Sequence, residues 1–172
     1  FGCLASTLAA LHYTFQIRHK DIKPQNILVK GKNVLFTDFG IALDWSITNH
    51  TTTQQETMRS PKYCAPETAS ETESRNAQTD IWSLGCVFLE MVTVLKGLPR
   101  SAVEDALQGQ PFHRNKTGID MLMAELRKKP KCANTPLDWI AKMLQVKKEK
   151  RPQSKELKEA ILKTDTPGRL VF

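Results

Sequence analysis

The chain has 172 residues, of which 40% are hydrophobic and 25% charged, a composition that suits one globular domain with a proper core. Its net charge of +7 would favour an acidic partner, but no aromatic residues lie among the basic clusters, as a nucleic-acid stacking surface requires. We therefore disfavour nucleic acid as a partner and expect these basic clusters to be solvated faces.

The sequence predicts a location inside the cell, in the cytoplasm, the nucleus or both. Its four cysteines form no CxxC pair or Cys/His cluster of zinc-binding spacing, so we expect free thiols in a reducing compartment. No secretion signal is visible at the N-terminus. Polar residues interrupt the most apolar segment, residues 81–95, so we expect no membrane span. The chain begins at Phe1 rather than Met, so we expect natural sequence to precede it.

In chain order, the first predicted element is an amphipathic helix over about residues 3–16, where apolar residues recur at helical spacing. Pro24 prevents this helix from continuing. Two short apolar runs, residues 27–29 and 34–36, then flank a connection that contains glycine and asparagine. This pattern predicts a small β-hairpin, and a hairpin brings its two outer ends close together.

The second half of the chain is predicted to be mainly helical. Residues 43–62 are polar and lack periodicity, so we expect a mobile loop there. Residues 80–95 are apolar on nearly every face, which predicts a buried central helix. Further helices are expected within residues 97–116, over residues 119–126, from Thr135 as N-cap, and after Pro152.

Polar side chains gather at the two ends of the predicted hairpin. His19-Lys20-Asp21-Ile22-Lys23-Pro24-Gln25-Asn26 leads into its first strand, and Asp38-Phe39-Gly40 follows its second. We therefore expect Asp21, Asn26 and Asp38 to meet in space. Two carboxylates, a lysine and a carboxamide can hold the phosphates and metal ions of a nucleotide beside an acceptor hydroxyl.

The order and spacing of these residues resemble the catalytic and metal-binding loops of eukaryotic protein kinases. Several motifs carry the resemblance, which covers nearly the whole chain: His19-Lys20-Asp21, Lys23, Asn26, Asp38-Phe39-Gly40, Ala65-Pro66-Glu67, Asp80 to Gly85, and Arg151. It implies a mainly α fold of the α+β family, in which a helical bundle surrounds a buried central helix. It also implies that residues 1–172 are a partial catalytic domain, the large C-terminal lobe without the small lobe.

The resemblance implies a role for each polar residue of the two loops. Asp21 would accept or orient the proton of the substrate hydroxyl, and Lys23 would neutralise charge on the transferring phosphoryl group of ATP. Asn26 and Asp38 would ligate Mg²⁺, and Gly40 would allow the turn after Asp38. The alternatives are a loop-capping aspartate for Asp21, a solvated lysine, and a turn-forming Asx pair.

Other matched positions are implied to be structural. His19 and Phe39 would pack in the core, and Asp80 would hydrogen-bond the backbone of the loop that carries Asp21. Glu67 and Arg151 would form a buried ion pair. Ser60 would bond Asp21 and Lys23, which together with the position of Lys23 favours serine and threonine over tyrosine as acceptors.

The sequence departs from the family pattern at a few positions. Lys20 replaces the usual arginine, so a phosphorylated activation loop would dock less firmly. His12-Tyr13 replaces the usual residues near the end of the first helix. Thr51, Thr52, Thr53 and Thr57 are candidate phosphorylation sites within the polar loop.

These motifs lead to an ATP- and Mg²⁺-dependent serine/threonine protein kinase with protein substrates as the expected function. A pseudokinase or truncated kinase-like binding module is the alternative, and a basic nucleic-acid binder is a third class. The glycine-rich loop and strand lysine of the family are missing from this sequence, so we expect the 172 residues to be inactive alone.

Overall fold

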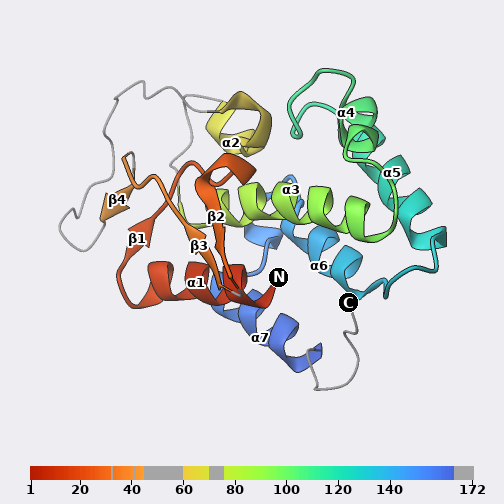
Figure 1. Ribbon diagram of the computed structural model, residues 1–172. Helices are drawn as coiled ribbons and strands as arrows, with labels where there is room; N and C mark the ends of the chain where they lie inside the picture. The colour runs from red at the N-terminus through yellow and green to blue at the C-terminus, as the bar shows by residue number, and fades with distance from the viewer. Residues whose placement is uncertain (32, 41, 45–59, 70–75, 165–172) are drawn as a thin grey trace.

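Helix α3, Gln78–Leu95, runs through the middle of the molecule, and other helices pack around it (Figure 1). The computed structural model describes residues 1–31, 33–40, 42–44, 60–69 and 76–164. Residues 79–90 of α3 are all buried, as expected for a helix that is apolar on nearly every face. By length and composition alone α3 would suffice to cross a bilayer, but 72% of it is buried inside the fold, the environment of a core helix.

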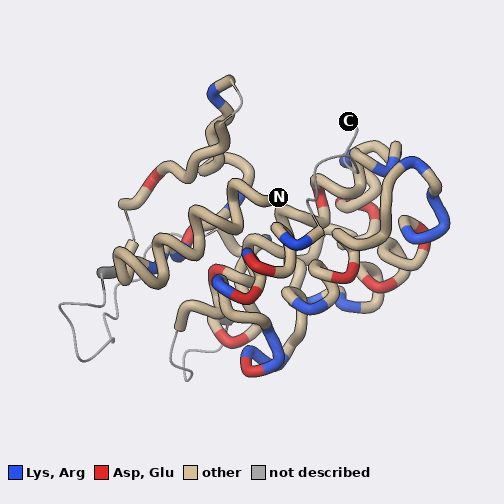
Figure 2. The backbone as a smooth tube through the Cα atoms, turned by 90° about the horizontal axis from the view of Figure 1, so that it is seen from below, with Lys and Arg blue, Asp and Glu red and all other residues tan. Residues whose placement is uncertain are grey.

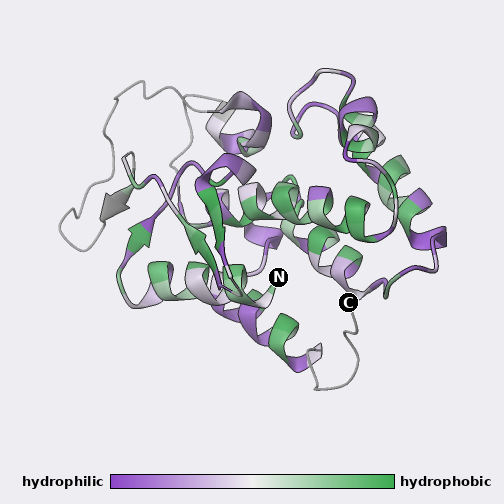
Figure 3. Cartoon of the chain, viewed as in Figure 1, coloured by the Kyte–Doolittle hydropathy of each residue, from purple (hydrophilic) through white to green (hydrophobic). Residues whose placement is uncertain are grey.

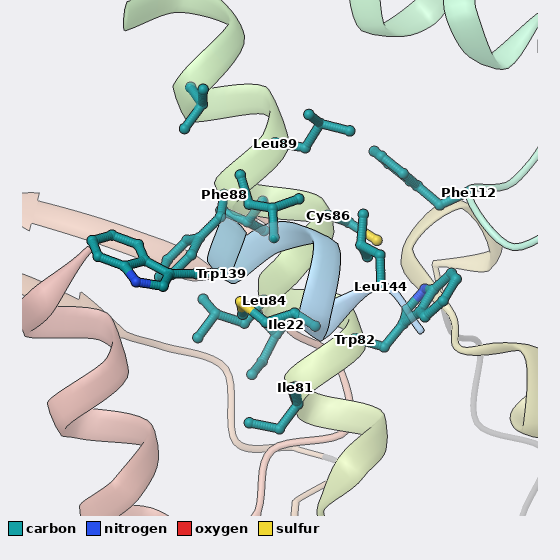
Figure 4. Close-up of a cluster of buried hydrophobic side chains, with 14 of the residues drawn as sticks. Ile22, Ile81, Trp82, Leu84, Cys86, Phe88, Leu89, Phe112, Trp139 and Leu144 are labelled. Carbon is teal, nitrogen blue, oxygen red and sulfur yellow. The ribbon is translucent and has the colours of Figure 1, made fainter. Parts of the chain in front are cut away.

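The other described helices of seven or more residues each pack against a partner helix. Helix α1 (Gly2–Tyr13) contacts α7 (Ser154–Thr164), α6 (Thr135–Met143) packs along α3, and α4 (Ser101–Leu107) packs on α5 (Lys116–Lys128). Figure 4 shows Phe88 of α3 in one buried cluster with Trp139 of α6 and with Phe112 from the segment between α4 and α5. The predicted bundle around a central helix is therefore present.

Two helices begin at other residues than predicted. The Asn115 side chain accepts a hydrogen bond from Gly118 N at 3.0 Å, so α5 begins at Lys116, ahead of the predicted residue 119. Thr135 is the first residue of α6 rather than its N-cap, which is Asn134. The Asn134 amide oxygen accepts from Lys96 Nζ at 2.7 Å instead of capping the helix.

Two small antiparallel sheets lie beside the helices. Strands β2 (Ile27–Lys30) and β3 (Asn33–Phe36) form the predicted hairpin, with Ile27 opposite Phe36. Gly31 in the connection has a φ of 61°, a conformation that glycine adopts without strain. Strand β1 (Ile17–Arg18) pairs with β4 (Leu43–Asp44).

Strand β4 and a short 3-10 helix, Pro61–Tyr63, occupy the described ends of the segment that was predicted to be a mobile loop. Residues 45–59, including the candidate phosphorylation sites, lie outside the described residues. A four-residue helix, α2 (Pro66–Ala69), follows that 3-10 helix. Basic and acidic residues are interspersed along much of the described chain, with a run of basic residues near the α5–α6 connection (Figure 2).

Candidate active site

The loop between β1 and β2 closes around the carboxylate of Asp21. Its atom Oδ2 lies 2.6 Å from Lys23 Nζ and accepts a hydrogen bond from Asn26 Nδ2 at 3.0 Å. The same Asn26 amide donates to the backbone oxygen of Asp21 at 2.8 Å. A 3-10 helix that starts at Pro24 and ends at Asn26 makes this return possible, and Asn26 is buried. The loop thus brings three of the predicted site residues into direct contact.

The hairpin places Asp38 next to this loop. Thr37 N donates to the backbone oxygen of Asn26 at 2.9 Å, one step beyond the Ile27–Phe36 pair, so Asp38 leaves the hairpin where the Asn26 loop enters it. Asp38 is exposed and has a φ of 61°, which is uncommon for a residue other than glycine. Its atom Oδ1 accepts from Gly40 N at 3.3 Å, which helps to hold the turn.

The side-chain oxygen atoms of Asn26 and Asp38 suit a hard divalent cation. Asn26 directs its NH₂ group to Asp21, and among the described residues its amide oxygen Oδ1 accepts no hydrogen bond. No cluster of three or more His, Cys, Asp or Glu side chains with metal-binding geometry occurs in the described part of the chain. The donors at hand are therefore the Asn26 amide oxygen and the Asp38 carboxylate, and oxygen donors of this kind fit Mg²⁺.

Ser60 lies on the other side of Lys23. Lys23 Nζ donates to Ser60 Oγ at 2.8 Å, so the amine bridges Ser60 and Asp21. Ser60 was expected to bond Asp21 as well, but within the described residues no such hydrogen bond forms, because the Lys23 amine occupies the position between the two side chains. A cavity of about 30 Å³ opens here, and Lys20 and Cys64 are among its lining residues.

Asp80, near the start of α3, anchors the backbone of the loop that carries Asp21. Its carboxylate accepts from His19 N and Lys20 N, each at 2.9 Å. Lys20 has a φ of 68°, so these bonds fix a backbone conformation that lysine rarely adopts. Burial lowers the pKa of the Arg18 guanidinium, and the nearby charge of Asp80 opposes that shift.

His12 is a supporting residue whose role the sequence analysis left open. Its Nε2 donates to Asp80 Oδ2 at 3.0 Å, and its Nδ1 lies 3.1 Å from Ser154 Oγ on α7. The imidazole is buried and so connects α1, α3 and α7 beneath the loop. One sign of this role was present in the sequence: His12 lies one helical turn after Leu8, on the side of the predicted helix that faces the core.

His19 and Phe39 differ in their surroundings, although both were expected to pack in the core. His19 is fully buried, and its Nε2 donates to Thr37 O at 3.0 Å. The Phe39 ring lies with its centroid 4.9 Å from that of His19, but 43% of the residue is exposed. The expectation for Phe39 was wrong for this chain, because one side of the ring meets His19 and the described residues leave much of the rest uncovered.

A buried ion pair joins the segment after Ser60 to the last third of the chain. The Arg151 guanidinium contacts both carboxylate oxygens of Glu67, at 2.6 Å and 2.8 Å. Arg151 also donates to the backbone oxygens of Gln145, Gln78 and Val146, and it lies over the Trp82 ring. Each polar group of the pair is therefore satisfied in the interior.

One protein family and two curated relatives match this sequence. The family described as "Protein kinase domain" matches residues 1–161. The chain is 32% identical to "Serine/threonine-protein kinase Nek2" of Mus musculus over 152 residues, which are 87% of this chain and 31% of that protein. It is 40% identical to "Serine/threonine-protein kinase Nek2" of Homo sapiens over 81 residues, 46% of this chain and 17% of that protein. The chain thus spans less than a third of the length of these curated relatives.

Proposed function

The chain belongs to the eukaryotic-type serine/threonine protein kinase family, and from this membership we propose that it forms the large lobe of a kinase catalytic domain. The reaction would transfer the terminal phosphoryl group of ATP to Ser or Thr hydroxyls of protein substrates. The observation that carries the proposal is the closed loop in which Asp21 contacts both Lys23 and Asn26. Asp38 follows the adjoining end of the hairpin.

An exposed apolar surface next to the candidate site supports the assignment to one lobe. Leu28 and Leu35 face each other across the β2–β3 hairpin and are 51% and 44% exposed. Val29 is exposed on the same hairpin, and Phe39 follows it in the chain. Both strands are hydrophobic in Figure 3. An apolar surface of this kind suits contact with a second lobe and with the base of a nucleotide.

Each polar residue of the loop has a task in phosphoryl transfer. Asp21 orients the attacking hydroxyl and takes up its proton. Lys23 contacts Asp21. Its positive charge would offset the negative charge of the phosphoryl group during transfer. The Asn26 amide oxygen and the Asp38 carboxylate would hold Mg²⁺. When bound, ATP supplies the phosphoryl group and Mg²⁺ neutralises its oxygens.

The supporting contacts explain how the loop keeps this arrangement. Asp80 anchors the backbone at His19 and Lys20, so the Asp21 carboxylate is positioned before a substrate arrives. The Lys23–Ser60 hydrogen bond links the loop to the segment on which a substrate would lie. This link supports Ser and Thr as the acceptors.

The free thiols of the described cysteines support an intracellular location, in the cytoplasm or the nucleus.

Replacement of Asp21 tests the proposed function. In the natural protein that contains these residues, Asp21→Asn should lower phosphoryl transfer to Ser/Thr peptides by roughly 10²–10⁴-fold, because proton handling is lost. Radiolabel transfer from ATP measures this rate, and unchanged melting of the variant controls for folding. Full activity of a folded Asp21→Asn protein would rule the proposal out.

The 172 residues alone should transfer phosphate slowly, because they contain no glycine-rich loop to position the phosphates of ATP.

A further inference from the structure

Buried Glu90 lies at the centre of a cluster of charged side chains. Its side chain on α3 is only 7% exposed. The Tyr63 hydroxyl donates to Oε1 at 2.8 Å, and Lys62 Nζ donates to the same atom at 3.0 Å. Arg100 Nε lies 3.3 Å from Oε2. Glu90 therefore has partners on both of its oxygens.

Lys62 fills a box made of two carboxylates and two aromatic rings. Besides Glu90, its amine donates to Glu104 Oε1 on α4 at 2.5 Å. The same nitrogen lies 5.2 Å from the centroid of the Tyr63 ring and 5.7 Å from that of Phe112. Carboxylates and aromatic faces both attract a cation, so this arrangement suits any ammonium or guanidinium group.

The amine of Lys62 is charged in this box. Burial lowers the pKa of Lys62, but hydrogen bonds to Glu104 and Glu90 and the charge of Glu90 outweigh burial and leave the pKa above its ordinary value. Phe112 N also donates to the Lys62 backbone oxygen at 3.0 Å, which holds the residue against the helices. The cation is thus fixed through both its backbone and its side chain.

The box lies beside the segment on which a substrate would bind. Lys62 belongs to the 3-10 helix that begins directly after Ser60, and Ser60 accepts a hydrogen bond from Lys23. The side chain of Lys62 is 27% exposed and that of Glu104 51% exposed, so the box is accessible from solvent. A substrate residue near the acceptor hydroxyl can therefore reach it.

We propose that Glu90, Glu104, Tyr63 and Phe112 form a subsite for a cationic side chain, and that Lys62 fills this subsite from within. Lys62 is then a specificity-determining residue that disfavours protein substrates with Lys or Arg at the matching position. The inference rests on the proposed function for the existence of a protein substrate, whereas the box and its occupant rest on the contacts alone.

Physical reasons favour the internal lysine over a substrate cation. Lys62 is covalently tethered, so it fills the box without the entropy loss that a free peptide must overcome on binding. A substrate cation must first displace it and leave a charged amine without its two carboxylates. Removal of Lys62 does not strand Glu90, because Tyr63 and Arg100 remain as its partners. A truncated variant should therefore fold.

The first experiment tests the box without any need for catalysis. In Lys62→Ala, n-butylammonium should refill the subsite and raise the melting temperature, because a ligand that binds only the folded state stabilises it. Sodium chloride at equal ionic strength should not have this effect. Lys116→Ala is the matched control, since Lys116 also pairs with a carboxylate, that of Asp120, but outside the box. Equal responses of both variants to butylammonium would overturn the proposal.

The second experiment tests specificity by equilibrium binding. Fluorescence anisotropy would compare serine peptides that carry Arg, Gly or Asp at each position near the serine. Lys62→Ala should bind one of the Arg peptides about tenfold more tightly than its Gly counterpart, as expected for a charged hydrogen bond, and the natural protein should show no such preference. Addition of Glu104→Gln should abolish most of the gain. A folded Lys62→Ala protein with no preference for Arg refutes the proposal.

These readouts separate the inference from the function on which it rests. Butylammonium stabilisation and peptide binding do not require phosphoryl transfer. An inactive natural protein that passes the butylammonium test would leave the subsite in place and remove only the kinase reaction. An active kinase whose Lys62→Ala variant fails both tests would remove only the subsite.

Discussion

At the scale of single residues, a buried hydrogen bond changes the pKa of Tyr63. The hydroxyl of Tyr63 is buried against Glu90, and burial together with the Glu90 carboxylate raises the pKa of Tyr63 to about 12. The neutral phenol is the favoured form in the folded protein. The stability it contributes is therefore fully present below its ordinary pKa of 10.0 and is lost as the pH rises through about 12.

This shift predicts an alkaline titration that Tyr63→Phe removes. The sequence contains two tyrosines, Tyr13 and Tyr63, so the tyrosinate absorbance of the folded protein should include a late step near pH 12. Tyr63→Phe should abolish that step, and Tyr13→Phe should leave it. If the late step persists in folded Tyr63→Phe, the contact with Glu90 does not control the titration.

At the scale of elements, α6 and its C-cap residue lie close against α3 at Gly85. A Cβ atom at this position would lie 2.9 Å from Met143 Cβ and 3.0 Å from Leu144 Cδ2, too close for either helix to accept without a shift. Glycine thus lets α6 lie directly against the central helix, although glycine within a helix costs about 1 kcal/mol relative to alanine.

Replacement of this glycine should loosen the contact between the two helices. We expect Gly85→Ala to lower the free energy of unfolding by about 1–3 kcal/mol, because overpacking exceeds the gain in helix propensity. Urea unfolding followed by circular dichroism measures the change. Ala141→Gly, on the partly buried side of α6, is a control that alters helix propensity without overpacking. A Gly85→Ala protein as stable as the natural one would mean that α6 moves away freely.

At the scale of the whole molecule, the Glu67–Arg151 pair joins parts of the chain that are 84 residues apart. It connects α2, the backbone at the start of α3 and the segment before α7. Both residues are buried, with Arg151 3% and Glu67 6% exposed, so neither charge is screened by water. Loss of one partner leaves a charge in the interior.

We therefore expect Arg151→Ala to lower the free energy of unfolding by roughly 3–5 kcal/mol and to loosen the whole fold rather than alter chemistry selectively. Thermal melting measures the effect. Arg127→Ala is the matched control: Arg127 pairs with Asp138 on the surface, where an ion pair contributes about 1 kcal/mol or less. Melting of Arg151→Ala at the temperature of the natural protein would contradict this prediction.

The sequence by itself determined the features that depend on local pattern. The motif order indicated the kinase family, apolar residues on every face of α3 indicated its burial, and short apolar runs around Gly31 indicated the hairpin. The helix and the hairpin are each encoded within a few consecutive turns or residues, because helix and strand periods repeat locally. The family is encoded by short motifs whose order along the chain can be read without the structure. The mainly helical fold was predictable for the same reason.

Only the tertiary structure decided the contacts between distant segments. His12 meets Asp80 across 68 positions, and Lys62 meets Glu90 across 28, and no periodic pattern marks either pair. The exposure of Phe39 likewise depends on which surfaces come together around His19. A side chain finds such partners only after the helices have packed. Packing thus determines which residues support the candidate site, whereas the site residues themselves were evident from the order of the motifs in the sequence.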